Sequence, residues 1–171
     1  MVRTHSSRME QPTSPIRPTD DQARTVAHSI LAAVRYGALA TIETATGAPM
    51  ATKIAVGYAP DEGLFGYMSD LAQHTQNLRA NANVSLLLET AADKGDPMNA
   101  PRLTLMAKAR RVDRDTPEHN TLRDLYLARF PKAKLYIGFT DFAFYRFDLA
   151  KAHLNGGFGK AFILTPADLG A

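Results

Sequence analysis

The chain has 171 residues, of which 45% are hydrophobic and 22% are charged, with no cysteine and a formal charge of +3. This length suits a single hydrophobic core. The absence of cysteine excludes structural disulfides, cysteine-ligated zinc, iron–sulfur clusters and a thiol nucleophile. Residues 1–19 carry three arginines against one glutamate, so the rest of the chain is nearly neutral and the pI of about 9.3 does not indicate nucleic-acid binding.

Residues 1–19 are predicted to form a disordered leader, because repeated prolines and few apolar side chains leave little surface to bury. The segment lacks the apolar run of a signal peptide. The longest weakly polar run, about 30–42, contains Arg35 and Gly37 and is too short to span a membrane. We therefore expect one domain over 20–171, located in the cytoplasm and not in a membrane.

A helix is predicted to follow the leader, with Thr19 or Asp20 as its N-cap. Gly37 is expected to end this helix as the residue after its C-cap. The apolar side chains recur at helical spacing and form one stripe, which comprises Ala23, Val26, Ala27, Ile30, Leu31 and Val34.

Short strands separated by turn signals are predicted to come next. They cover 38–43, 49–58, 64–68, 83–89, 102–112 and 142–149. Two further helices interrupt them, one over about 71–79 and one that begins at Pro117 and ends before Pro131. Six strands in meander order with few helices predict a mainly β fold, whose antiparallel sheet closes or half-closes into a barrel.

The segment 69–78 is the first candidate for chemistry. Ser69 places a hydroxyl at the end of a strand, and the first turn of the following helix carries Gln73, His74 and Thr75. A helix N-terminus offers unpaired backbone N–H groups and a partial positive charge, so these donors would suit a phosphate. The alternative, favoured by residue types alone, is that Ser69 or Asp70 caps the helix and His74 is exposed.

Two basic residues are further candidates for anion binding. Lys53 lies among apolar neighbours in a predicted strand, where it is either an anion ligand or, by default, a solvated outward-facing residue. Arg102, at the start of a strand, is suited either to grip a phosphate with two hydrogen bonds or to pair with Asp96. The glycine-rich segment 156–160 indicates a turn and does not match a phosphate-binding loop.

Other kinds of site find little support in the sequence. The five histidines are scattered and show no metal-binding spacing, so no metal site is predicted. The basic cluster at 108–111 lacks the interleaved aromatic residues of RNA-binding surfaces. No residue stands out as a catalytic acid, base or nucleophile.

Six short stretches occur in order between about residues 24 and 165. They are RYGALAT at 35–41, SDLAQHTQNL at 69–78, VSLL at 84–87, GDP at 95–97, PRLTL at 101–105 and GGFGKA at 156–161. Together they resemble the FMN-binding split barrels of the pyridoxamine 5′-phosphate oxidase superfamily, and most closely the haem-utilisation branch of the HugZ and HutZ type.

This resemblance implies a six-stranded antiparallel split β-barrel that works as a homodimer and holds one FMN in each of two interface clefts. It implies a flavin-dependent oxidoreductase of unknown substrate. In such proteins the second strand, the passage from the third strand into its helix and a later strand hold the phosphate. Carried onto this chain, the cofactor-binding residues are Thr52, Lys53, Ile54, Met68, Ser69, Gln73, His74, Thr75 and Arg102.

The chain departs from the oxidase at two points. Gln73 and His74 replace an Arg–Lys pair in the phosphate helix, which lowers the positive charge there. The oxidase's tryptophan-containing C-terminal segment has no counterpart, so pyridoxamine phosphate oxidase activity is not expected. One alternative is a haem-binding or haem-utilisation protein, in which His28, His74, His119 or His153 would ligate the iron, with His153 beside the glycine-rich segment as the first choice. Another is a non-catalytic split-barrel dimer.

Overall fold

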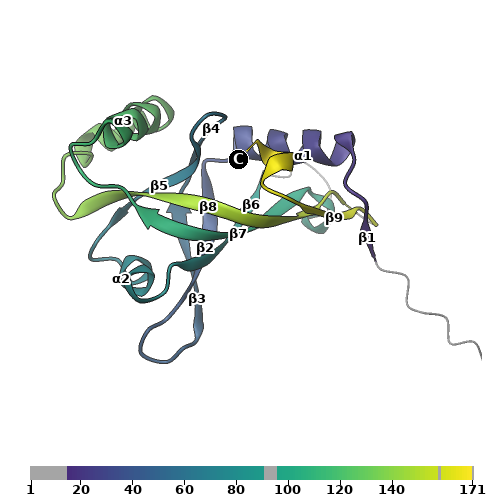
Figure 1. Ribbon diagram of the computed structural model, residues 1–171, viewed down its shortest axis with the longest axis horizontal. Coiled ribbons are helices and arrows are strands. Elements are labelled where there is room, and N and C mark those ends of the chain that lie inside the picture. Colours follow the sequence, from purple (N-terminus) through teal and green to yellow (C-terminus); the bar gives the residue numbers. More distant parts are fainter. Residues whose placement is uncertain (1–14, 91–95, 158, 171) are drawn as a thin grey trace, which may run out of the picture.

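A computed structural model describes residues 15–90, 96–157 and 159–170, and a single twisted sheet forms its body (Figure 1). The strands follow the order β1-β9-β8-β7-β6-β2-β3, while β4 pairs with β5 and β5 with β8. They are β1 (Ile16–Arg17), β2 (Tyr36–Ile42), β3 (Pro49–Ala55), β4 (Gly57–Ala59), β5 (Gly63–Ser69), β6 (Asn83–Glu89), β7 (Arg102–Arg111), β8 (Phe142–Asn155) and β9 (Ala161–Leu164).

The sheet is mixed and does not close into a complete barrel. All of its pairings are antiparallel except the parallel pair of β1 and β9. Strand β8 joins the two parts of the sheet, because its first half pairs with β5 and its second half pairs with β9. Strands β3 and β5 lie at the gap and are not paired in the described residues. The fold is therefore mainly β with flanking helices, arranged as a split barrel.

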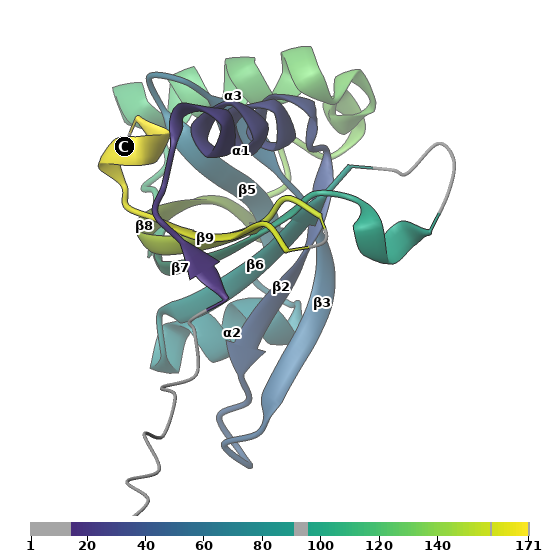
Figure 2. The ribbon, with the colours of Figure 1, turned by 90° about the vertical axis from the view of Figure 1, so that its right-hand side faces the viewer.

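Three helices flank the sheet: α1 (Asp21–Ala33), α2 (Gln73–Ala80) and α3 (Pro117–Arg129). Helices α1 and α3 lie on one side of it, and α2 lies on the other side beside β2 (Figures 1 and 2). Three short 3-10 turns complete the chain, η1 (Pro97–Asn99), η2 (Pro131–Leu135) and η3 (Ala167–Leu169). No helix in the described ranges is long and apolar enough to cross a membrane.

Helix α1 starts as predicted and ends earlier. The Asp20 side chain accepts a hydrogen bond of 2.7 Å from the backbone N–H of Ala23, which fixes the first turn. The helix ends at Ala33, and Gly37 lies inside β2, so the prediction that Gly37 ends the helix is wrong. A Cβ at Gly37 would lie 2.8 Å from the carbonyl oxygen of Leu87 in β6, so the close approach of these strands requires glycine.

The strand pattern differs from the prediction in three places. The expected strand 49–58 is divided into β3 and β4 at Val56, whose N–H donates to the carbonyl of Arg35. The last predicted strand continues to Asn155, and the turn after it leads into β9, which was missed. Residues 16–17 of the expected leader form β1, whereas residues 1–14 lie outside the described part. The expected count of six strands is therefore not confirmed.

Two hydrophobic clusters hold the layers together. The larger lies beneath α1 and includes Ile30, Leu39 and Leu86, each of them fully buried. The smaller lies between α3 and the strands β5 and β8 and is mostly aromatic, with Phe65 and Phe144 at its centre. Because each large side chain contributes about 1.5–3 kcal/mol when buried, this smaller cluster anchors α3 firmly against the sheet. It forms one wall of the candidate site.

Candidate functional site

A surface cavity of about 330 Å³ lies where β3, β5, the start of α2 and the chain around η2 meet. We call it the α2 cavity. Five of the predicted cofactor-binding residues line it: Lys53, Ile54, Met68, Ser69 and His74. The other lining residues are Ala55, Tyr67, Ala72, Tyr126, Tyr136 and Phe142. Two stretches about twenty residues apart in the sequence thus meet at one site, as the resemblance implied.

An aromatic wall closes one side of the α2 cavity. The Tyr67 ring lies 6.2 Å from the Tyr136 ring at an interplanar angle of 20°, and 5.1 Å from the Phe142 ring. The Tyr67 hydroxyl donates a 2.7 Å hydrogen bond to the carbonyl of Ile137. Burial raises the pKa of Tyr67 and of Tyr126, so both phenols stay protonated and the wall carries no charge. Such a surface suits a flat ring.

The N-terminus of α2 opens toward the cavity without a side-chain cap. Its N-cap position is Ala72, which lines the cavity and has no capping group. The Ser69 hydroxyl instead donates to Asp141 at 2.8 Å and accepts from the N–H of Leu71 at 3.1 Å. Asp70 forms ion pairs of 3.2 Å with two arginines. The prediction that Ser69 or Asp70 caps the helix is therefore wrong, and the helix start, which carries a partial positive charge, borders the cavity through Ala72 and His74.

His74 is half-buried in the first turn of α2, not exposed as the capping alternative required. Its Nδ1 lies 3.1 Å from the Thr52 hydroxyl, which brings Thr52 beside the cavity. Burial lowers the pKa of His74 below the ordinary value, so the imidazole is neutral at pH 7. It therefore supplies a hydrogen-bonding group to this site and no fixed positive charge.

Lys53 lies on the outward face of β3, at the rim of the α2 cavity. Its Nζ lies 4.0 Å from the ring centroid of Tyr36, a cation–π contact that holds the side chain along the sheet surface. It also borders a second hollow on the outer sheet face, lined in part by Leu87 and Glu89. The two sequence alternatives for Lys53 are thus compatible, since the residue faces outward and borders a cavity.

Gln73 and Thr75 do not line the cavity, although both belong to the first turn of α2. The Gln73 side chain donates to Asn77 at 3.0 Å, and Asn77 in turn donates to Thr41 of β2. Thr75 is fully buried, and its hydroxyl has no hydrogen-bond partner among the described residues. These residues attach α2 to β2 and so fix the position of the helix end.

Arg102 lies apart from the α2 cavity within one chain. It is the first residue of β7, and its guanidinium donates a hydrogen bond of 2.9 Å to the carbonyl of Met98. Asp96, its predicted alternative partner, instead accepts from the N–H of Met98 and caps η1. In the sheet order β7-β6-β2-β3, three strand spacings, or about 14 Å, separate β7 from the strand of Lys53. Phosphate binding by Arg102 therefore stays a prediction. It would require a second copy of the chain to bring Arg102 to the cavity.

The aromatic wall was not predicted. Tyr126 belongs to the apolar stripe of α3, and Phe142 belongs to the alternating pattern of β8, so each looked like an ordinary core residue. Tyr136 follows η2, where the sequence has no periodic pattern. Only the path of the chain from α3 to β8 brings these rings beside Tyr67.

The model of one protein family, described as CREG, beta-barrel, matches residues 18–169. The chain belongs to the CREG beta-barrel family. Solved structures share the fold of this CREG beta-barrel chain. Atu2129 from Agrobacterium tumefaciens strain C58, of unknown function, is 35% identical, with a TM-score of 0.75 over 88% of this chain and 61% of its own.

Two solved structures whose names refer to haem also share the fold of this chain. A heme-binding protein from Mycobacterium smegmatis is 27% identical, with a TM-score of 0.79 over 91% of this chain and 61% of its own. The present chain thus spans about three-fifths of the length of this protein and of Atu2129. HutZ, the heme storage protein from Vibrio cholerae, is 23% identical, with a TM-score of 0.65 over 72% of this chain and 87% of its own.

The fold is also that of a pyridoxinephosphate oxidase family protein related to general stress protein 26, from Clostridium acetobutylicum. That protein is 10% identical and has a TM-score of 0.67 over 88% of this chain and 99% of its own. At this identity, as for HutZ, the likeness shows the fold alone. No curated protein matches this sequence. These likenesses support the split-barrel fold, whereas FMN binding and the haem-utilisation branch stay predictions.

Proposed function

We propose that this protein binds FMN in the α2 cavity and acts as a flavin-dependent oxidoreductase. The observation that carries the proposal is the uncapped N-terminus of α2, which opens beside Lys53 into a cavity with an aromatic wall. One end of the cavity therefore suits an anion, and the other suits a flat ring. FMN combines a phosphate and a tricyclic ring in one molecule.

The phosphate end of the site relies on backbone groups more than on side-chain charge. An α-helix N-terminus carries about half a positive charge and presents N–H donors, which suffices for a phosphate. Lys53 adds a full charge at the rim, and His74 adds a neutral donor or acceptor. Ser69 supports the loop through Asp141 instead. With one lysine and no arginine among the residues that line the cavity, we expect FMN to bind more weakly than in the oxidase.

The ring end is apolar and rigid. The rings of Tyr67, Tyr136 and Phe142 offer a surface against which an isoalloxazine would pack. When bound, FMN would supply hydride or electron transfer, while the protein would bind the flavin, orient it and exclude water from one of its faces. The phenols stay protonated at neutral pH and would not act as bases, and the Tyr67 hydroxyl already donates to the carbonyl of Ile137.

The outer face of the sheet supports a homodimer as part of this proposal. Exposed apolar side chains on this face include Leu87 of β6, Met106 of β7 and Ile163 of β9. The strand register places Leu87 beside Ala38, and Ala38 beside Lys53. The apolar face is therefore continuous with the rim of the α2 cavity. A second copy packed there would cover the rim and complete two cofactor clefts.

Haem is the second candidate, favoured by the state of His74. A metal-binding imidazole is normally neutral and is oriented by a hydrogen bond to its other nitrogen. His74 has a lowered pKa, lies against Thr52 through Nδ1 and lines the cavity. His153 is less suitable, because it lies on β8 between Thr104 and Ile163, away from this cavity. The Mycobacterium smegmatis relative, which is named for haem binding, supports this alternative.

Parallel titrations of flavin fluorescence with FMN and with riboflavin test the main proposal. We expect saturable quenching by the protein in both cases, with FMN bound at least about tenfold more tightly, since a charge-assisted phosphate contact contributes roughly 1.5–3 kcal/mol. Equal affinities for FMN and riboflavin would refute the phosphate site, and a lack of saturation at high micromolar FMN would refute flavin binding. Haemin added to the same protein tests the alternative, which requires a Soret shift that His74→Ala abolishes and His153→Ala preserves.

A further inference from the structure

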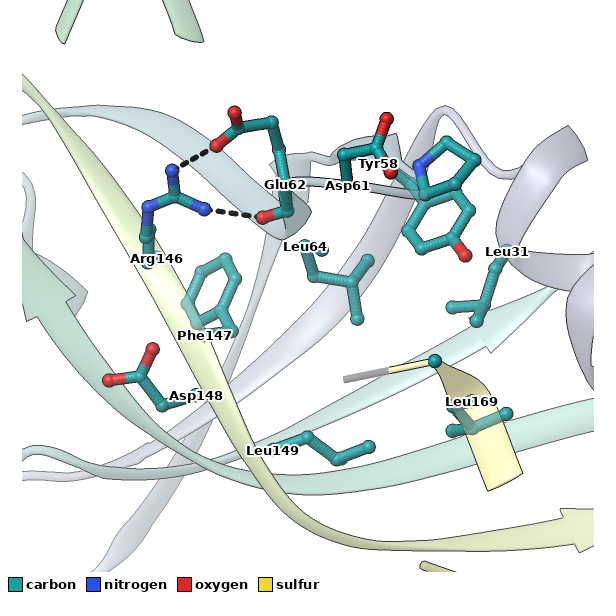
Figure 3. Close-up of a pocket in the computed structure, with 13 residues that line it drawn as sticks. Leu31, Tyr58, Asp61, Glu62, Leu64, Arg146, Phe147, Asp148, Leu149 and Leu169 are labelled. Carbon is teal, nitrogen blue, oxygen red and sulfur yellow. Dashed lines mark hydrogen bonds and ion pairs between the residues drawn. The ribbon is translucent and has the colours of Figure 1, made fainter. Parts of the chain in front are cut away.

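A second cavity of about 330 Å³ lies on another part of the molecule and shares no lining residue with the α2 cavity. It lies between the β4–β5 turn, the middle of β8, α1 and η3 (Figure 3). We call it the β4–β5 cavity. Its volume is at the lower end of the range for small-molecule sites.

The floor of the β4–β5 cavity is apolar and comes from four separate elements. Leu31 of α1, Leu64 of β5, Leu149 of β8 and Leu169 of η3 point toward its centre (Figure 3). Leu31, Leu64 and Leu169 are buried in the core, so the floor is fixed by the packing of the whole domain. An apolar group of a ligand that entered would replace water on this floor, which is favourable.

The mouth of this cavity carries an excess of negative charge. Arg146 lies in its lining, but the guanidinium binds the carboxylate and carbonyl of Glu62 and the carboxylate of Glu118, so its charge is already compensated. Asp61 is exposed in the turn and forms no ion pair among the described residues. Asp148 is 57% exposed and meets the Arg110 side chain only at 3.7 Å. Asp61 therefore remains available for a positive charge.

We propose that the β4–β5 cavity binds a small organic cation, an amine with an alkyl or aryl body. The body would occupy the leucine floor, and the ammonium group would lie at the mouth beside Asp61. The ring of Tyr58, which also lines the cavity, offers a cation–π surface to the same group. The ion pair of Arg146 with Glu62 and its hydrogen bond to the Glu62 carbonyl hold the turn, and with it Asp61, in place before a ligand arrives. This site is independent of any cofactor in the α2 cavity.

Three probes with a common phenyl body test the proposal: 2-phenylethylamine, 2-phenylethanol and 3-phenylpropionate. Each would be titrated into the ¹⁵N-labelled full chain at pH 7 and followed by amide chemical shifts. We expect saturable shifts for the amine, centred on the 60–63 turn and η3. The alcohol should bind about two- to fivefold more weakly and the carboxylate more weakly still, as an exposed charge pair contributes up to about 1 kcal/mol.

Single substitutions separate the contribution of the Asp61 charge to ligand affinity from that of the leucine floor. Asp61→Asn should weaken the amine two- to fivefold and leave the alcohol unchanged, whereas Asp124→Asn, an exposed acid of α3, should change neither. Leu149→Trp, which fills the cavity, should weaken both probes. The proposal is overturned if the amine gives no saturable shifts up to 10 mM (about the weakest affinity of interest), if the shifts lie elsewhere, or if Asp61→Asn leaves the preference of amine over alcohol unchanged.

Discussion

Lys53 is the only formally charged residue that lines the α2 cavity in the described part of the chain. Its contact with Tyr36 keeps the ammonium group on the outer face of β3, within reach of the cavity mouth. In the proposed FMN complex, this lysine and the helix end would share the neutralisation of one phosphate. Because the α2 backbone and the Lys53 side chain would each neutralise part of the phosphate charge, a substitution of Lys53 alone measures the contribution of the lysine.

Lys53→Gln should weaken FMN about tenfold and leave riboflavin affinity unchanged, because only FMN carries the phosphate. Lys160→Gln is a matched control, since Lys160 is exposed near the β8–β9 turn and does not line the α2 cavity. Fluorescence titration measures both affinities. Equal losses for FMN and riboflavin would show that Lys53 acts on the ring or on folding, and not on the phosphate.

His119 makes the stability of the protein depend on pH. It is 7% exposed, lies edge-on to Phe144 at 5.2 Å, and its Nδ1 has no partner among the described residues. Burial, together with the nearby charge of Arg114, lowers its pKa in the folded state. Below the unfolded pKa of about 6.5, the unfolded chain binds a proton that the folded chain does not. Stability is therefore complete above that pH and falls as the pH drops toward the lowered folded value.

We expect urea denaturation to show lower stability at pH 5.5 than at pH 7.5, by at most about 1.4 kcal/mol per pH unit for each such histidine. His74, whose pKa is also lowered, contributes in the same direction. His119→Gln should flatten the pH dependence, whereas His28→Gln, on the exposed face of α1, should not. An unchanged slope in His119→Gln would contradict this assignment.

At the scale of elements, the start of α2 lacks a side-chain cap at the place where we propose that the phosphate binds. The backbone at Ala72 has φ −70° and ψ 138°, which is the conformation that an N-cap residue adopts. A side chain able to cap the helix would fit there without strain. Its absence leaves the helix end free for an anion.

Ala72→Asp should therefore stabilise the protein without ligand by about 0.5–1 kcal/mol, which raises Tm by roughly 1–4 °C, and weaken FMN at least about tenfold. The new carboxylate would cap the first turn and occupy the place of the phosphate. Ala72→Ser, which caps without charge, should stabilise similarly and weaken FMN less. Thermal melting and FMN titration of the same samples check both effects. An unchanged FMN affinity in Ala72→Asp would show that the phosphate does not bind at the start of α2.

The elements that the sequence predicted well are those set by local chemistry. Asp20 and Pro117 start their helices as expected, because capping and the fixed φ of proline act within one turn. Gly37 was misread because the carbonyl of Leu87 that requires a glycine there belongs to a strand fifty residues away. Strand β9 was missed because it is short and depends on its partner β8.

The same distinction explains how much of the site could be predicted. Lys53, Ser69 and His74 were found through a family resemblance, which carries tertiary information, and they do line one cavity. Residue types alone favoured a cap at Ser69, because nothing in the sequence shows that its hydroxyl is bound to Asp141, seventy-two residues away. The aromatic wall likewise depends on long-range packing of η2 against β5.

At the scale of the whole molecule, the apolar outer face of the sheet predicts self-association. Leu87 is 37% exposed at the centre of that face, with Ala38 and Thr104 as its cross-strand neighbours. Leu87→Lys should convert the proposed dimer to a monomer, because a charge would have to be desolvated in the interface. Asn120→Lys, on the exposed side of α3, is the control. Light scattering after gel filtration gives both masses, and a wild-type monomer would refute the dimer.

A crystal structure grown with saturating FMN is the sharpest test of the proposal that α2, Lys53 and the aromatic wall together hold one FMN. We expect the phosphate within hydrogen-bond distance of the first-turn amides of α2 and near Lys53, with the flavin ring against Tyr67 and Tyr136. The same structure would show whether Arg102 of a second copy reaches the cofactor. FMN bound at another place, or an α2 cavity without flavin density, would refute the proposal.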